Sequence, residues 1–179
     1  MHQIVQENIR RAVDAFNRLV AGLSDADFER PHGSKWSAGQ DLKHLTKTLR
    51  AVQLALLLPL PLLRLLFGKP NRKGRSEAEL KEKYRKALSK GFKAPRLYHP
   101  GKVKVEERDA LVKKHARIAE ALCKQMACLS ERTLDSYLLP HPAMGKSTLR
   151  EMIIFSWLHA EHHTRLLKAK LDGRAAEEL

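Results

Sequence analysis

Four long stretches of the chain repeat apolar residues at the spacing of an α-helix, and this pattern limits the fold more than any other feature. They lie at about residues 2–23, 36–56, 105–129 and 149–172. An amphipathic helix must bury its apolar stripe against another element. No segment between these stretches alternates apolar and polar residues as a half-exposed strand does. The sequence therefore predicts an all-α fold, a four-helix bundle with a long basic insertion between helices 2 and 3.

Sequence signals mark where the helices begin and end. Three pairs have the spacing of a capping box, in which two side chains satisfy the first turn of a helix: Ser37 with Gln40, Ser76 with Glu79, and Thr148 with Glu151. The second pair opens a short helix that should end near Gly91. Gly173 is placed to end the last helix, and the tail beyond it should fray. Residues 24–35 and 130–146 are expected to be loops.

Length and composition fit one globular domain. The chain has 179 residues, of which 43% are hydrophobic and 30% are charged, a balance typical of a protein with a sizeable core. We therefore expect a single domain over residues 1–179. The first helix carries charges throughout, so we do not expect a secretory signal there. Cys123 and Cys128 point to different faces of one helix, and we expect two reduced thiols in a cytoplasmic protein.

A very apolar run, Leu54–Phe67, follows the second long helix. Pro59 and Pro61 interrupt it and Arg64 adds a charge. The run is too short and too broken to be a transmembrane helix. Three interpretations stay open: a core segment, a subunit contact in a homodimer, or an anchor at a membrane interface.

Positive charge gathers in one region of the sequence. The stretch Arg64–Lys104 has fourteen Lys and Arg and three Glu, a net charge of +11 out of +14 for the whole chain. We place an insertion at about residues 59–104 and expect Arg72–Lys104 to be peripheral and dispensable for folding. A solvated insertion is the simpler interpretation. The alternative is a surface for nucleic acid, an anionic membrane or an acidic substrate, although no nucleic-acid-binding motif accompanies it.

Two histidines lie within the apolar stripe of the last long helix. At about 100° per residue, His159 and His163 project into the middle of the stripe one turn apart. His162 falls on its edge near Phe155. One divalent ion would bind both lone pairs, because the i, i+4 spacing suits two ligands of one metal. A pair of core histidines satisfied by backbone, carboxylate or water explains the same pattern, so both interpretations stay open on these residues alone.

Two further histidines are less informative by themselves. His115 faces inward on the third long helix, and we expect it to be a core histidine. His44 flanks the apolar stripe of the second long helix instead of lying within it. A single histidine beside an apolar stripe is usually structural or partly exposed.

Three motifs occur in an order that resembles a known family. Trp36–Leu45 opens the second long helix, His141–Thr148 leads into the last one, and His159–His163 lies within it. Together they resemble the DinB/YfiT-like superfamily, and the resemblance covers most of the chain except the basic insertion.

The resemblance implies a metal site and a class of chemistry. It implies a four-helix bundle that binds a divalent metal, zinc or nickel, through His44, His159 and His163, with His162 outside the ligand set. Three neutral imidazoles leave one coordination position for water or substrate, as in catalytic metal sites. Some relatives are thiol-dependent transferases or isomerases, so the resemblance implies a small-molecule substrate used with a low-molecular-weight thiol, or a hydrolysis.

A general base is not evident in the sequence. Asp41 and Glu161 lie near the expected ligands, but Glu161 points away from the apolar stripe. We expect either residue at most to support a ligand.

Three functional hypotheses follow from these features. The leading one is a divalent-metal-dependent transferase or hydrolase. The second is a non-enzymatic bundle that binds a metal or a partner protein. The third is a protein that binds nucleic acid or an anionic membrane through the basic insertion. A homodimer is compatible with all three.

Overall fold

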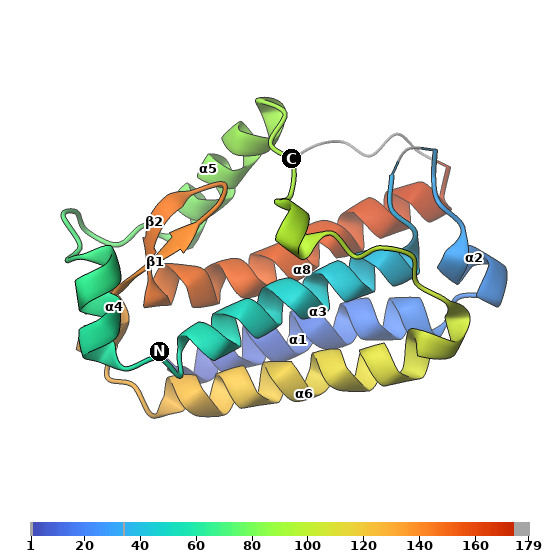
Figure 1. Cartoon of the computed structure of the whole chain (residues 1–179). Coiled ribbons are helices and arrows are strands. Elements are labelled where there is room, and N and C mark those ends of the chain that lie inside the picture. The colour runs from blue at the N-terminus through green and yellow to red at the C-terminus, as the bar shows by residue number, and fades with distance from the viewer. Residues whose placement is uncertain (1, 34, 174–179) are drawn as a thin grey trace.

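Four long helices lie side by side in the computed structural model, which describes residues 2–33 and 35–173. They are α1 (His2–Ala21), α3 (Ala38–Ala55), α6 (Arg108–Ala127) and α8 (Leu149–Leu171) (Figure 1). Most of the described chain is helical, which confirms the helical fold class. The expectation that the tail beyond Gly173 frays concerns residues outside the described part.

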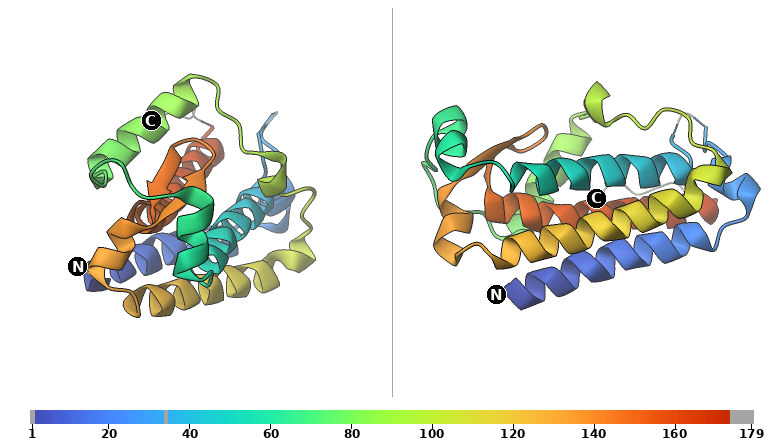
Figure 2. Two further views of the ribbon diagram at one scale, coloured as in Figure 1. Left: turned by 60° about the vertical axis from the view of Figure 1, so that its left-hand side comes forward. Right: turned by 60° about the horizontal axis from the view of Figure 1, so that its bottom comes forward.

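The predicted apolar stripes meet between these helices. Both α1 and α3 pack against α6 and α8, and the second view of Figure 2 shows the four rods next to one another. Each helix contributes side chains that are 0–1% exposed, among them Ile9, Phe16, Leu42, Leu122, Leu149 and Ile153. Burial of such side chains supplies about 1.5–3 kcal/mol each and holds the helices together.

All three capping boxes form where the sequence predicts them. Ser37, Ser76 and Thr148 accept hydrogen bonds from the backbone three residues later, and the side chains at those positions accept from the cap backbone in return. Gly173 follows the last helix with a φ of 66°, a conformation that glycine adopts at helix ends.

Two expected loops contain short regular elements. Ser24 caps α2 (Asp25–Glu29), and the region before α8 forms α7 (Glu131–Ser136) followed by two strands, β1 (Leu138–His141) and β2 (Gly145–Thr148). The strands pair antiparallel from Leu138 opposite Thr148 to His141 opposite Gly145. The expectation that no sheet occurs between the helices is therefore wrong here. Strands of four residues are too short to show a clear alternation in sequence.

The apolar run after α3 is only partly buried. It includes α4 (Leu60–Phe67), in which Leu63 is fully buried while Leu65 is 82% exposed. No single helix of the described chain is long and apolar enough to cross a membrane. The pair α3 and α4 passes the same test when taken together, but the two helices are bent by 107° at their junction.

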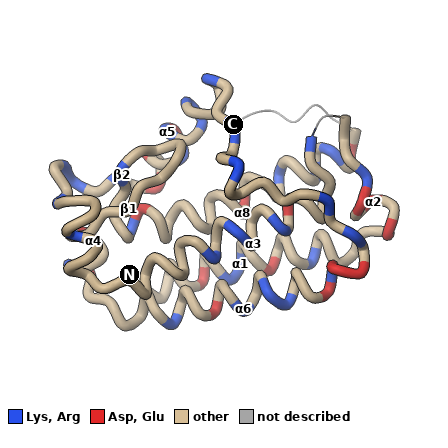
Figure 3. The backbone as a smooth tube through the Cα atoms, in the orientation of Figure 1, with Lys and Arg blue, Asp and Glu red and all other residues tan. Residues whose placement is uncertain are grey.

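Residues 77–103 pass over α3 and α8 and are called the covering segment below (Figure 1). The segment contains α5 (Glu77–Ser89) and the turn η1 (Arg96–Tyr98), and η2 (Val105–Glu107) then leads into α6. Leu80 and Val103 are buried, so both ends of the segment join the core. Apart from Leu80, Pro100 and Val103, the segment is exposed or half-buried, so it lies at the surface and is anchored near its two ends. That the fold persists without Arg72–Lys104 stays a prediction. Figure 3 also shows that basic residues are spread along α6 and are not confined to this segment.

Candidate metal centre

Three histidines from two helices converge beneath the covering segment. His44 comes from α3, and His159 and His163 come from α8. One ring nitrogen from each lies within 4.8 Å of the others, and the Nε2 atoms of His44 and His159 are 3.3 Å apart. The three residues are only 3–7% exposed. The structure thus brings together the three histidines that the family resemblance names.

Hydrogen bonds fix which nitrogen carries the proton in two of the rings. The Nδ1 atom of His44 lies 2.9 Å from the carbonyl oxygen of Tyr98, which can only accept. The Nδ1 atom of His163 lies 3.0 Å from a carboxylate oxygen of Asp41. Both Nδ1 atoms must therefore be the donors, which leaves a lone pair on each Nε2 atom.

The third ring is oriented by a hydroxyl group. Thr48 donates its hydroxyl proton to the carbonyl oxygen of Leu45 at 3.1 Å. Its oxygen can then accept from Nδ1 of His159, which lies 3.4 Å away. In this tautomer the Nε2 atom of His159 has a lone pair as well, whereas in the other tautomer it would donate to Nε2 of His44, 3.3 Å away.

This arrangement suits a divalent cation. In the tautomer with the proton of each ring on Nδ1, the three Nε2 lone pairs face one another, and one metal ion would satisfy them all at once. Two nitrogen ligands at 2.0–2.1 Å from a tetrahedral zinc ion would lie about 3.4 Å apart, close to the 3.3 Å between His44 and His159. The chemistry of the donor set therefore fits zinc or a similar ion.

Burial keeps the three imidazoles neutral. It lowers the pKa of His159 and His163 well below the usual value, and the neighbouring histidines lower both further. Burial also lowers the pKa of His44, although the hydrogen bond to Tyr98 opposes this. Neutral imidazole is the form that binds a metal, so the site needs no proton loss at neutral pH.

A chain of hydrogen bonds holds His163 from behind. Asp41 accepts from His163 through one oxygen and from the Lys170 ammonium through the other, at 2.6 Å. Lys170 also donates to the carbonyl oxygen of Trp36 at 3.0 Å. Burial raises the pKa of Asp41, and Lys170 opposes this by stabilising the carboxylate. Asp41 therefore fixes the ring of His163, as expected of a supporting residue, whereas sequence reasoning did not identify Lys170 as part of this chain of hydrogen bonds.

The other candidate residues lie outside the group of three converging histidines. His162 is outside the convergent group but is 8% exposed, because Tyr84 of α5 packs against it with 5.4 Å between ring centres. His115 is a core histidine whose Nδ1 atom lies 2.8 Å from the side-chain oxygen of Asn17. Glu161 points away from the site and approaches Arg11 at 3.7 Å.

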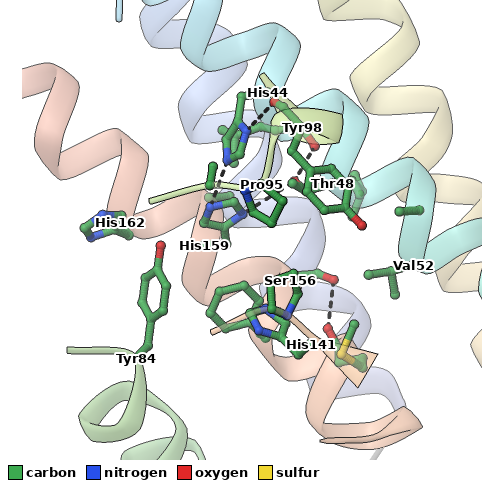
Figure 4. Close-up of a pocket in the computed structure, with 18 of the residues that line it drawn as sticks. His44, Thr48, Val52, Tyr84, Pro95, Tyr98, His141, Ser156, His159 and His162 are labelled. Carbon is green, nitrogen blue, oxygen red and sulfur yellow. Dashed lines mark hydrogen bonds between the residues drawn. The ribbon is translucent and has the colours of Figure 1, made fainter. Parts of the chain in front are cut away.

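A cavity of about 430 Å³ opens beside the three histidines. Its walls are α3 and α8, and the covering segment and the end of β1 close it with Tyr84, Pro95, Tyr98 and His141, as Figure 4 shows. Sequence reasoning missed these wall residues. They come from segments that join α3 and α8 only through tertiary contacts, so no periodic pattern marks them.

Two wall residues present hydrogen-bond donors. Backbone N–H groups of Ala143 and Met144 donate to Nδ1 of His141, at 3.1 and 3.2 Å, so the proton of this ring lies on Nε2. Burial, with the nearby Arg75 charge, lowers the pKa of His141 to about 4. Burial raises the pKa of Tyr84 to about 12, and its hydroxyl points toward the histidines (Figure 4). Both groups are therefore neutral donors at physiological pH.

A comparison with known families matches residues 8–167 to the DinB superfamily. No curated protein and no solved structure gives a significant match. The matched range includes all three convergent histidines and the covering segment.

Proposed function

The chain belongs to the DinB superfamily, as its three motifs predict, and from this premise we propose that it is an enzyme dependent on a divalent metal, zinc or nickel. His44, His159 and His163 would hold the ion through their Nε2 atoms. One observation carries the proposal: ring nitrogens of three buried, neutral histidines lie within 4.8 Å of one another, and Nδ1 donors on His44 and His163 leave their Nε2 atoms free to bind an ion.

The bound ion would supply a Lewis acid with a position open to water or substrate. The chain's own groups would orient the substrate. Tyr84 and His141 donate hydrogen bonds into the cavity, and the apolar walls exclude water. No Asp or Glu lines the cavity within residues 2–33 and 35–173. This favours transfer to a substrate that brings its own nucleophile, such as a low-molecular-weight thiol, over a hydrolysis that requires a carboxylate base.

The domain organisation is part of the same proposal. We infer a single domain in which α1, α3, α6 and α8 form a four-helix bundle and residues 59–104 are an insertion that covers the site. A metal site between facing helices is typical of such bundles.

The proposal is tested on protein purified without a histidine tag. We expect about one equivalent of divalent metal per chain by elemental analysis. Thiol-transfer activity toward electrophilic small molecules should disappear with a chelator and return with the metal. Full metal occupancy without any metal-dependent activity would favour the non-enzymatic hypothesis, and a protein that binds no zinc or nickel would overturn the proposal.

A further inference from the structure

The cavity is long and follows the two helices that carry the histidines. On α3 its lining residues run from His44 to Ala55, and on α8 from Met152 to His163. Eleven residues of helix extend about 16 Å. The histidines lie at one end of this distance, because His44 contacts His159 and His163 and the two helices run antiparallel (Figure 1).

The far end of the cavity has no polar side chain. Six residues line it: Val52, Ala55, Leu58, Phe67, Leu139 and Met152. His44, Tyr84, His159 and His163 lie toward the other end, and Ser156, whose hydroxyl donates to the carbonyl oxygen of Met152, lies between the two ends. The cavity therefore has a polar end and an apolar end.

The cavity is also large enough for an organic tail. Its volume of about 430 Å³ lies within the range of ligand pockets. Protein interiors are close-packed, and a large cavity lined by apolar side chains stays dry and takes up apolar ligands.

We propose that the substrate is an amphiphile with a hydrocarbon tail. The reacting head group lies at the histidines, where Tyr84 and His141 donate to it, and the tail extends along α3 and α8 toward Ala55. The placement of the head group rests on the proposed function, whereas the placement of the tail rests on the shape and lining of the cavity alone.

Linear alkanoates from butanoate to dodecanoate are suitable probes, with binding measured by calorimetry on metal-loaded and metal-free protein. Affinity should rise about fourfold per methylene until the cavity is full, with the same slope in both forms. A flat dependence of affinity on chain length would overturn the inference.

Ala55→Phe tests where the tail lies. A phenyl ring at the far end should stop the rise in affinity about two carbons earlier, because it occupies close-packed space that the chain would fill. Butanoate affinity and metal content should not change. Ala116→Phe is the matched control, because Ala116 is exposed on α6 and does not line the cavity. If Ala55→Phe does not fold, the chain-length series on the natural chain still tests the inference.

The two proposals fail separately. A chain-length slope in a protein that binds no metal would overturn the metal site and leave the tail channel in place. Stoichiometric metal with no chain-length slope would overturn the tail channel alone.

Discussion

Helix α8 has two buried polar clusters, and they differ in how they are satisfied. At its first turn Glu151 is 0% exposed, and both carboxylate oxygens accept hydrogen bonds from Arg72 and Arg75, at 2.6–3.1 Å, and from backbone N–H groups. Two to three turns later His159 and His163 converge with His44, and the Nε2 atoms of His44 and His159 are 3.3 Å apart. The first cluster is satisfied within the chain, whereas the second is the proposed cation site.

The electrostatics of the two clusters follow from this difference. Burial by itself would raise the pKa of Glu151, but the hydrogen bonds from Arg72, Arg75 and the backbone outweigh it and hold the pKa far below the usual range. The Nε2 atoms of the histidines face one another instead of a counter-charge, and burial keeps the rings neutral. A buried carboxylate with its own counter-charges is satisfied within the chain, whereas converging neutral imidazoles could bind a metal ion, as we propose.

The largest expected effect is loss of metal binding at the second cluster. His159→Ala or His163→Ala should reduce affinity for zinc more than about 100-fold, because each removes a direct ligand. His162→Ala is the matched control and should leave most of the affinity, since His162 faces Tyr84. Competition with a chromophoric chelator measures all three. If His162→Ala lost the metal and His163→Ala kept it, the ligand assignment would be wrong.

The sequence predicted the long helices better than the parts between them. Periodicity and capping boxes depend on residues a few positions apart, so Ser37, Ser76 and Thr148 marked three helix starts correctly. The hairpin was missed because Leu138–His141 is too short for a pattern. The structural role of Arg72 and Arg75 was missed, because their partner Glu151 lies on α8, more than 70 residues away.

Site residues that share one helix were easier to predict than those whose surroundings come from distant segments. His159 and His163 lie on one helix, so the helical period alone predicted that both side chains face the core. His44 was ambiguous because its burial depends on the covering segment, whose Tyr98 carbonyl oxygen fixes its ring. His162 was expected at an edge, but Tyr84 buries it from α5. Contacts between distant segments decide these cases, and one sequence does not reveal them.

The first cluster should affect stability and leave metal affinity nearly unchanged. Glu151→Ala should lower the free energy of unfolding by about 2–4 kcal/mol, because it leaves two arginines without their counter-charge while Arg72 still reaches water. Glu120→Ala breaks an exposed pair with Arg10 and should cost less than about 1 kcal/mol. Urea unfolding measures both variants. Equal effects of the two substitutions would mean that the buried cluster does not stabilise the fold.

A smaller effect on zinc affinity is expected from substitution of Asp41, which contacts both a charged partner and one of the histidines. This carboxylate has a counter-charge in Lys170 and also holds His163 in place. Asp41→Asn should weaken zinc affinity about 10–100-fold, because the ligand loses the partner that orients it. Glu161→Gln, also next to the site in sequence but paired with Arg11, should have little effect. Equal zinc affinity in the Asp41 variant and the natural chain would show that Asp41 does not position His163.

The smallest expected effect is a pH dependence of stability that comes from buried His115 and not from Glu151. Burial lowers the pKa of His115 to about 4, so the unfolded chain binds a proton near pH 6.5 that the folded chain does not. Its contribution is fully present above pH 6.5 and is lost as pH falls toward 4. As the pH falls from 7.5 to 5.5, protonation of His115 in the unfolded chain should lower the free energy of unfolding by about 1.4 kcal/mol. The loss of stability over this pH range should be smaller by the same amount in His115→Gln. Glu151 should contribute nothing in this window, because its depressed pKa leaves it ionised in both states. Urea unfolding of metal-free protein at the two pH values measures the difference, and an unchanged pH dependence in His115→Gln would show that His115 is not held neutral in the folded protein.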